Sequence, residues 1–190
     1  LYDYYLMPTG AFYGTRQACQ PLNVVYNPVE HAIYLTNELL EDFGNLSTHA
    51  SVFDIQSRLL WEDTAVAAVC SQSALKVISL PELVGLPGST YFLDLRIQNE
   101  KGNELARNFY WLSAKKDICD YKSSDFHHTP NTQYADFTGL RDMPCAMVSG
   151  KCRTESFGDD AGISVDLYND SEYIAFFIEL GILDSNTGNT

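Results

Sequence analysis

Histidine side chains bind metals and transfer protons near neutral pH, and two of the four in this sequence are adjacent. His127 and His128 lie in a polar stretch, Tyr121–Pro130, that has no clear hydrophobic period. Adjacent side chains of an extended segment point in opposite directions, which disfavours a shared metal ion. The sequence therefore predicts a surface connector here. His31 and His49 stand alone and are expected to make ordinary hydrogen bonds.

Carboxylates are the second source of chemistry, but no pair among the 25 acidic residues is marked out for catalysis. Glycoside hydrolysis needs two carboxylates at a set separation across a cleft. No nucleophile elbow, P-loop, dinucleotide fingerprint or Cys–His arrangement is distinguishable either. We therefore predict no catalytic residue, no metal site and no cofactor, and substrate-binding residues stay unknown. The acidic clusters expected near turns are Glu38, Glu41, Asp42, Glu62 and Asp63, together with Asp159 and Asp160, which lack calcium-loop spacing.

Five cysteines, at positions 19, 70, 119, 145 and 152, form no CxxC pair, which argues against zinc and thioredoxin-like sites. Cys145 and Cys152 could face each other across a hairpin, although buried free thiols are the favoured interpretation. Two triplets, Asn45-Leu46-Ser47 and Asn169-Asp170-Ser171, have the N-glycosylation pattern. Asn45 and Asn169 are thus candidate glycosylation sites, and both are compatible with secretion.

The composition is that of a globular protein, with 45% hydrophobic and 19% charged residues. A net charge of -13 argues against nucleic acid and anionic membranes as partners. No apolar run approaches the roughly 20 residues of a membrane helix. The first residues have neither the basic nor the apolar region of a signal peptide.

The pattern of apolar residues predicts one short helix over 11–20, followed by strands. The clearest strand is Tyr91–Gln98, whose residues Tyr91, Leu93, Leu95 and Ile97 share one face and alternate with polar residues. About seven short strands in about ninety residues are typical of an immunoglobulin-like sandwich. The other expected strands are Val24–Tyr26, Ala32–Thr36, His49–Ile55, Leu75–Leu80 and Leu105–Ser113.

The aromatic run Phe109-Tyr110-Trp111 could be a sugar-stacking platform, a membrane wedge or part of a strand. Phe109 and Trp111 would lie on one face of the last strand of the sandwich, with Tyr110 and Leu112 on the other. We predict burial between sheets rather than exposure as a platform.

Beyond the connector, the pattern again indicates strands, over Ala146–Arg153, Ile163–Leu167 and Tyr173–Leu183, with a turn at Gly158–Gly162. Three or four strands are too few to close a sandwich. The second sandwich is therefore expected to be incomplete, with exposed edges and an exposed apolar face.

Three stretches together resemble the C-terminal part of family 2 glycoside hydrolases. They are LYDYYLMPTGAFYGTRQACQPL (1–22), TYFLDLRIQNEKGNELARNFYWLS (90–113) and DFHHTPNTQYADFTGLRDMP (125–144). The resemblance covers nearly the whole chain in the same order. It is closest to the exo-β-D-glucosaminidases that degrade chitosan, and mannosylglycoprotein endo-β-mannosidases come next.

The resemblance implies an all-β chain of two consecutive immunoglobulin-like β-sandwich domains, the second truncated, preceded by the last helix of a (β/α)8 barrel. Residues 1–22 would end that catalytic barrel, residues 23–115 would form the first sandwich, and residues 116–190 would form a connector and the incomplete second one. The family's two catalytic carboxylates would lie upstream of Leu1, so the resemblance assigns none here.

The implied function is that of an accessory fragment of a retaining glycosidase acting on β-linked amino sugar or mannose glycans. Its partners would be the upstream barrel and the oligosaccharide substrate, and the parent would be secreted. The acidic surface could steer cationic chitosan, although solubility alone explains such a charge equally well. The alternative function is a free-standing, non-catalytic carbohydrate-binding or structural module. An exposed aromatic row would favour that alternative, whereas burial of Trp61 and Trp111 would count against it.

Overall fold

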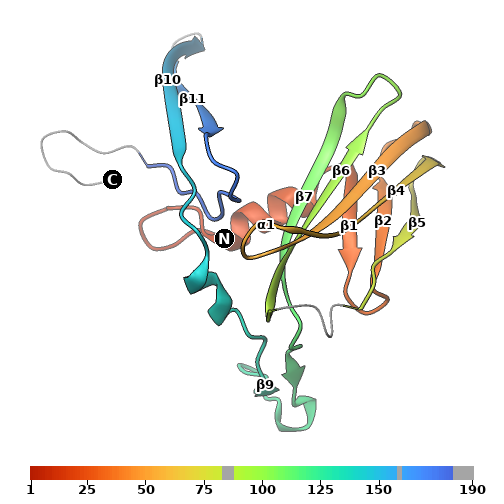
Figure 1. Cartoon of the computed structure of the whole chain (residues 1–190), viewed down its shortest axis with the longest axis vertical. Coiled ribbons are helices and arrows are strands. Elements are labelled where there is room, and N and C mark those ends of the chain that lie inside the picture. The colour runs from red at the N-terminus through yellow and green to blue at the C-terminus, as the bar shows by residue number, and fades with distance from the viewer. Residues whose placement is uncertain (83–87, 158–159, 182–190) are drawn as a thin grey trace, which may run out of the picture. The chain divides into compact units, whose positions relative to one another are not determined.

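The computed structural model describes residues 1–82, 88–157 and 160–181. They form two compact units, residues 1–142 and 143–190. No helix in the described part is long and apolar enough to span a membrane. Figure 1 shows the elements, which are α1 (Gly10–Ala18), β1 (Leu22–Asn27), β2 (Ala32–Asn37), β3 (Phe43–Asp54), β4 (Leu59–Val69), β5 (Ser73–Ser79), β6 (Thr90–Gln98), β7 (Glu104–Ser113), β8 (Ile118–Cys119), η1 (Tyr121–Ser123), β9 (Asn131–Gln133), η2 (Thr138–Asp142), β10 (Val148–Phe157) and β11 (Asp160–Asn169).

The first unit is built around a sandwich of two antiparallel sheets, which confirms the predicted immunoglobulin-like fold (Figure 1). One sheet has the order β1-β2-β5 and the other β4-β3-β6-β7. Side chains alternate along each strand, so every second residue enters the space between the sheets. The core consists mainly of Val24, Ile33, Leu35, Leu46, Ala50, Val52, Tyr91, Leu93, Leu95 and Ile97.

The second face of β6 is less polar and less exposed than the alternation predicted. Phe92 on this face is fully buried and stacks on Phe109, with the ring centroids 5.4 Å apart. Asp94 is also buried, because its carboxylate pairs with Arg96 at 2.6 Å and with Arg107 at 2.7 Å. A buried carboxylate is tolerated when charged hydrogen-bond donors surround it.

Strand β4 was not among the predicted strands, and it contains two acidic residues that were expected near a turn. Glu62 and Asp63 lie inside this strand, so the expectation that they cluster near a turn was wrong. Ala65 and Ala67 are among the β4 residues that pack against the core, and such small side chains give a weak apolar signal.

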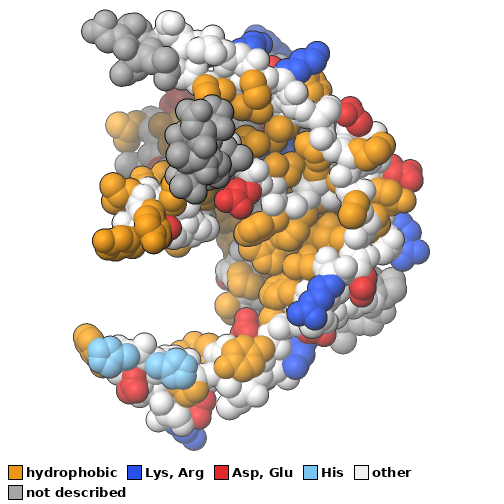
Figure 2. Space-filling model, turned by 90° about the vertical axis from the view of Figure 1, so that its left-hand side faces the viewer, with side chains coloured by type: hydrophobic (Ala, Val, Ile, Leu, Met, Phe, Trp, Pro, Cys, Tyr) orange, Lys and Arg blue, Asp and Glu red, His pale blue; other side chains and the backbone are white. Residues whose placement is uncertain are grey.

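Helix α1 confirms the predicted helix, but none of its residues is buried. Two hydrogen bonds fix its end to the sandwich: Gln17 Nε2 donates to the Arg107 carbonyl on β7 at 2.7 Å, and Asn23 Nδ2 donates to the Gln17 carbonyl at 2.7 Å. Hydrophobic side chains are exposed over much of the face that Figure 2 shows. In the segment ahead of α1, the exposed hydrophobic residues are Leu1, Tyr2, Tyr4, Tyr5, Leu6 and Met7.

In the described part of the second unit, β10 and β11 form an antiparallel hairpin where strands were expected. The predicted strand Tyr173–Leu183 was wrong as far as residue 181, since no strand occurs between Asp170 and Gly181. Phe177 has a positive φ of 58°, which interrupts an extended chain. Residues 182 and 183, and the turn residues Gly158 and Asp159, lie outside the described part.

All five cysteines are free and exposed. The predicted burial was therefore wrong, and the alternative disulfide between Cys145 and Cys152 is not formed. Cys19 follows a helix that buries none of its residues, and Cys152 lies on a two-stranded hairpin. Neither environment has a second layer of structure that would cover a thiol.

Candidate functional site

The inward face of the aromatic run joins the two sheets of the sandwich. Tyr110 and Leu112 pack against the core, as predicted. The Tyr110 hydroxyl accepts hydrogen bonds from the Tyr26 backbone N–H on β1 at 3.2 Å and from Asn108 Nδ2 at 2.8 Å. Burial raises the pKa of Tyr110 above its ordinary value, because the phenolate would lose hydration. This tyrosine therefore works as a neutral clamp between β1 and β7.

The outward face of the run is only partly covered. Phe109 is half-buried against Phe92, whereas Trp111 is 46% exposed. The prediction that Trp111 is buried between sheets was wrong, because its face of the sheet β4-β3-β6-β7 points away from the second sheet. Trp61 instead packs against the core. The structure thus contains no row of two exposed tryptophans.

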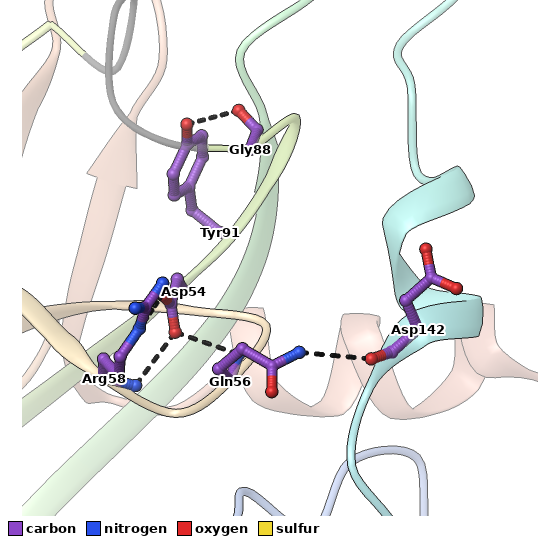
Figure 3. A network of polar contacts seen from close by, with 6 residues as sticks. All are labelled: Asp54, Gln56, Arg58, Gly88, Tyr91 and Asp142. Carbon is purple, nitrogen blue, oxygen red and sulfur yellow. Dashed lines mark hydrogen bonds and ion pairs between the residues drawn. The ribbon is translucent and has the colours of Figure 1, made fainter.

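A polar network at one corner of the sandwich fixes the turn between β3 and β4 (Figure 3). Asp54 Oδ1 accepts from the backbone N–H groups of Gln56 and Arg58 at 2.9 Å each, and Asp54 Oδ2 pairs with the Arg58 guanidinium at 2.7 Å. Gln56 Nε2 then donates to the Asp142 carbonyl at 3.3 Å. The network therefore connects the sandwich to η2.

Tyr91 lies opposite Asp54 in the β3–β6 register and makes a further hydrogen bond at this corner. Its hydroxyl donates to the Gly88 carbonyl at 2.5 Å (Figure 3). A tyrosine near the start of a strand that bonds back to nearby backbone is a known feature of immunoglobulin-like sandwiches. Burial, and then the charge of Asp54, raise the pKa of Tyr91.

The segment between β8 and β9, residues 120–130, forms an ordered loop that we call the connector loop. Asp120 caps η1 by accepting from the Lys122 and Ser123 backbone N–H groups and from the Ser123 hydroxyl. Mainly the Ser123 hydroxyl lowers the pKa of Asp120. Asp125 Oδ1 accepts from the backbone N–H groups of His127 and His128 at 2.7 Å each. These bonds hold the loop without a hydrophobic core.

The tip of the connector loop presents an aromatic pair to solvent. Phe126 is 96% exposed, and the His127 ring meets it edge-on with centroids 5.0 Å apart. His127 and His128 are both exposed, as expected for a surface connector. Tyr121, 80% exposed, begins η1 in the same loop.

Hydrogen bonds also hold the segment that follows β9 against the sandwich. Asp136 N donates to Ser113 Oγ at 2.9 Å, and Thr90 Oγ1 donates to the Asp136 carbonyl at 3.1 Å. The Asp136 carboxylate accepts from the Thr138 hydroxyl and backbone N–H, which lower its pKa, the hydroxyl more strongly. The connector is therefore part of the first unit, which extends to residue 142. The predicted domain division at residue 115 stays a prediction.

A shallow depression of about 560 Å³ lies beside β2 and β5. Its lining contains no aromatic ring, so it provides no stacking platform for a sugar. Its lining residues are Thr36, Asn37, Glu38, Gln72, Ser73 and Ala74.

Two family profiles match the chain. Residues 30–117 match the "Mannosidase Ig/CBM-like domain", and residues 126–190 match the "Exo-beta-D-glucosaminidase Ig-fold domain". The exo-β-D-glucosaminidase of Arthroderma benhamiae is 32% identical over 100% of this chain, and that of Hypocrea jecorina is 27% identical over 97%. The solved structure of the Amycolatopsis orientalis exo-chitosanase is 25% identical, with a TM-score of 0.82 over 90% of this chain.

The chain belongs to the immunoglobulin-like part of the exo-β-D-glucosaminidase family. It spans about a fifth of its relatives: 21% of each of the two glucosaminidases and 20% of the solved exo-chitosanase. A mannosylglycoprotein endo-β-mannosidase of Lilium longiflorum is 29% identical over 58% of the chain. The predicted resemblance to family 2 glycoside hydrolases, first to exo-β-D-glucosaminidases and then to mannosylglycoprotein endo-β-mannosidases, is thus confirmed.

The residues singled out from the sequence do not come together in the described part of this chain. Within the described residues, no three His, Cys, Asp or Glu side chains are grouped as a metal site. His31 contacts the Tyr26 hydroxyl at 3.2 Å and Lys116 Nζ at 2.8 Å. His49 contacts the hydroxyls of Ser47 and Thr64 at 3.1 Å each. Both histidines therefore make the ordinary hydrogen bonds that were expected.

The two candidate glycosylation sites have exposed amides in different settings. Asn45 lies in a bulge of β3 with a φ of 39°, and its Nδ2 donates to Glu100 Oε1 at 2.6 Å. Asn169 ends β11, where its Nδ2 donates to the Tyr173 carbonyl and its Oδ1 accepts from the Ser171 hydroxyl. Glycosylation of Asn45 and Asn169 stays a prediction.

Strand β4 was missed from the sequence, and so were two features of single residues and loops. Asp94 was placed on the polar face of its strand but is buried, and the connector loop was predicted as a surface connector without the hydrogen bonds that order it. The only available signal for the loop was the recurrence of Asp two or three residues before the backbone N–H groups it would bind, as at Asp120 and Asp125.

Proposed function

We propose that this chain is a non-catalytic accessory part of a retaining glycosidase that acts on β-linked amino sugar glycans. The supporting observation is that relatives with this activity match essentially the whole chain, while the chain makes up about a fifth of them. In this proposal the catalytic carboxylates lie in another part of the polypeptide. β-Linked mannose glycans are the second substrate class, because a mannosidase profile matches residues 30–117.

The proposed domain organisation follows the resemblance. Residues 1–22 end a catalytic (β/α)8 barrel, residues 23–115 are the first sandwich, and residues 116–190 are the connector and part of the second. The exposed hydrophobic residues ahead of α1 support this view, because a helix without a buried face needs a neighbouring surface to cover it. The parent enzyme is proposed to be secreted, which suits the two sequons.

The proposed task of the first sandwich is to hold the barrel's last helix in place. Gln17 bonds the end of α1 to β7, and Asn23 at the start of β1 bonds back to Gln17. A rigid sandwich attached at this point would restrict motion of a segment that the barrel must keep fixed. Support of this kind would contribute to stability and substrate positioning without direct contact with the scissile bond.

A complementation experiment tests this proposal. The catalytic barrel encoded with this chain would be expressed alone, and also together with residues 1–190 as a separate polypeptide. We expect residues 1–190 alone to release no glucosamine from glucosamine oligomers, the barrel alone to be poorly soluble or weakly active, and the mixture to be more active. A barrel that is equally active and stable without the chain would contradict an accessory role.

A free-standing carbohydrate-binding module is the alternative function, and one observation favours it. Trp111 is 46% exposed beside Phe109, and the matching profile describes a CBM-like domain. The packing of Trp61 against the core counts against an aromatic row. The test measures the affinity of the unchanged chain and of a Trp111→Ala variant for mannan and chitosan. If Trp111 is a binding platform, the variant loses affinity. If the chain is an accessory domain, the replacement leaves the affinity unchanged.

A further inference from the structure

The connector loop has the properties of a ligand-contacting loop rather than of a passive linker. A linker is normally mobile and polar. This loop instead holds Phe126 almost completely in solvent, on a backbone fixed by Asp120, Asp125 and a bond between the hydroxyls of Ser124 and Thr129 at 2.7 Å. Asp120 N also donates to the Pro130 carbonyl at 2.8 Å, which closes the loop at its base. Such order lowers the entropy that a ligand must overcome on binding.

The chemistry of the loop indicates the class of ligand. Aromatic rings bind the apolar face of a pyranose and attract cations through the ring electrons. Within the connector loop, residues 120–130, Asp120 and Asp125 outnumber the single cation Lys122, so the loop has a formal charge of -1 with neutral histidines, in a chain of net charge -13. The lowered pKa of Asp120 keeps that residue ionised under mildly acidic conditions. A sugar that carries an ammonium group complements both properties.

We propose that the connector loop binds β-linked amino sugar oligomers, with Phe126 as the stacking ring and the loop carboxylates attracting the protonated amines. The His127 ring contacts the Phe126 ring, so its nitrogens are placed to hydrogen-bond sugar hydroxyls, and His128 is exposed next to it in the chain. The inference rests on the proposed function for its substrate class. It adds a contact for the oligomer that is separate from any catalytic barrel.

The experiment is a titration of the complete chain, labelled with nitrogen-15, with a β-1,4-linked glucosamine tetramer at about pH 7, where an ordinary imidazole is mostly neutral and a share of the sugar amines is protonated. We expect amide shifts confined to residues 120–130 and weak affinity. Phe126→Ala should reduce the affinity about fivefold, the upper range for one exposed cation–π contact. Because Phe126 is 96% exposed, its replacement should leave the fold intact, as circular dichroism would verify.

Leu40→Ala is the matched control, since Leu40 is an 85% exposed apolar residue in the turn between β2 and β3. This variant should bind like the unchanged chain. The N-acetylated tetramer, which has no charge, should bind several-fold more weakly. No shift at up to about 10 mM tetramer, or equal binding by Phe126→Ala, would overturn the inference. Equal binding of the neutral tetramer would overturn the choice of an amino sugar.

The outcome can be separated from that of the accessory role. A chain that restores the barrel's activity but shows no shifts with the glucosamine tetramer would leave the accessory function standing and remove the loop proposal. A chain that binds the tetramer through Phe126 but fails to complement the barrel would support the loop proposal and contradict the accessory role. The loop would then belong to a free-standing binding module.

Discussion

Thr48 is a residue whose chemistry conflicts with its surroundings. It is fully buried on β3, and among the described residues its hydroxyl is the one buried side-chain polar atom without a hydrogen-bond partner. A buried, unpaired hydroxyl costs free energy relative to a methyl group of similar size. We expect Thr48→Val to raise the free energy of unfolding by about 1 kcal/mol in urea titrations.

Thr48→Ser is the control for this change, because it keeps the hydroxyl and removes the methyl group. It should destabilise the chain by about 1 kcal/mol through the cavity it leaves. If Thr48→Val is instead less stable than the unchanged chain, the hydroxyl has a partner such as an internal water molecule.

Tyr110 gives a prediction with a pH dependence. Tyr110→Phe removes the acceptor for the Tyr26 backbone N–H and for Asn108, and should cost about 1–2 kcal/mol at neutral pH. The folded pKa of Tyr110 is raised by burial, so its contribution is fully present below the unfolded value of 10.0 and is lost as pH rises through the folded pKa. Stability measured by urea unfolding should therefore fall above about pH 10, and less steeply in Tyr110→Phe. Parallel pH profiles for the two proteins would contradict this assignment.

At the level of single residues, the sequence predicted hydrogen-bonding roles better than burial. His31 and His49 make ordinary bonds because an isolated imidazole on a strand or turn usually finds a nearby hydroxyl or amine. The cysteines and Trp111 were placed wrongly, because burial depends on whether a second layer covers that face. Hydrophobic character alone does not carry that information.

At the scale of elements, the ion pair between Asp94 on β6 and Arg107 on β7 connects the two strands. Asp94→Asn keeps the side-chain volume but replaces charged hydrogen bonds to Arg96 and Arg107 with weaker ones. We expect a loss of about 2 kcal/mol in the free energy of unfolding, moderated because both arginine side chains are partly exposed.

Glu62→Gln is the matched control for Asp94→Asn, since Glu62 is exposed on β4 in the same sheet. Its stability should change by less than about 0.5 kcal/mol. Equal losses in the two variants would show that the general charge of the sheet matters, and not the pairing at Asp94.

The elements differ in how well their sequences predicted them, and the reason is packing. Strand β6 was evident because Tyr91, Leu93, Leu95 and Ile97 are large and alternate. Strand β4 was missed because Ala65 and Ala67 are small. Residues 173–181 alternate well but do not form a strand, since alternation describes faces and a strand also needs a neighbour for its backbone groups. The connector loop depends on side-chain bonds to backbone, which hydrophobic periodicity does not detect.

At the scale of the whole molecule, the two units differ in how much hydrophobic core is available to stabilise them. Residues 1–142 enclose a core between two sheets, whereas the described part of residues 143–190 has only the hairpin β10–β11. The hairpin exposes hydrophobic residues, including Met147, Val148, Ile163, Leu167 and Tyr168. Three or four strands were expected here, and the described part contains two, β10 and β11.

This inequality leads to a prediction about separated fragments. Residues 1–142 should unfold in a single cooperative transition in urea, because the core, the corner network around Asp54 and the connector all lie within them. Residues 143–190 alone should show no cooperative transition by circular dichroism, because an isolated two-stranded hairpin is marginally stable at best in water. A sigmoidal transition in the shorter fragment would mean that residues 143–190 bury a core of their own. In that case the second unit would be an independent domain, and its exposed apolar residues would have to be explained as a binding surface.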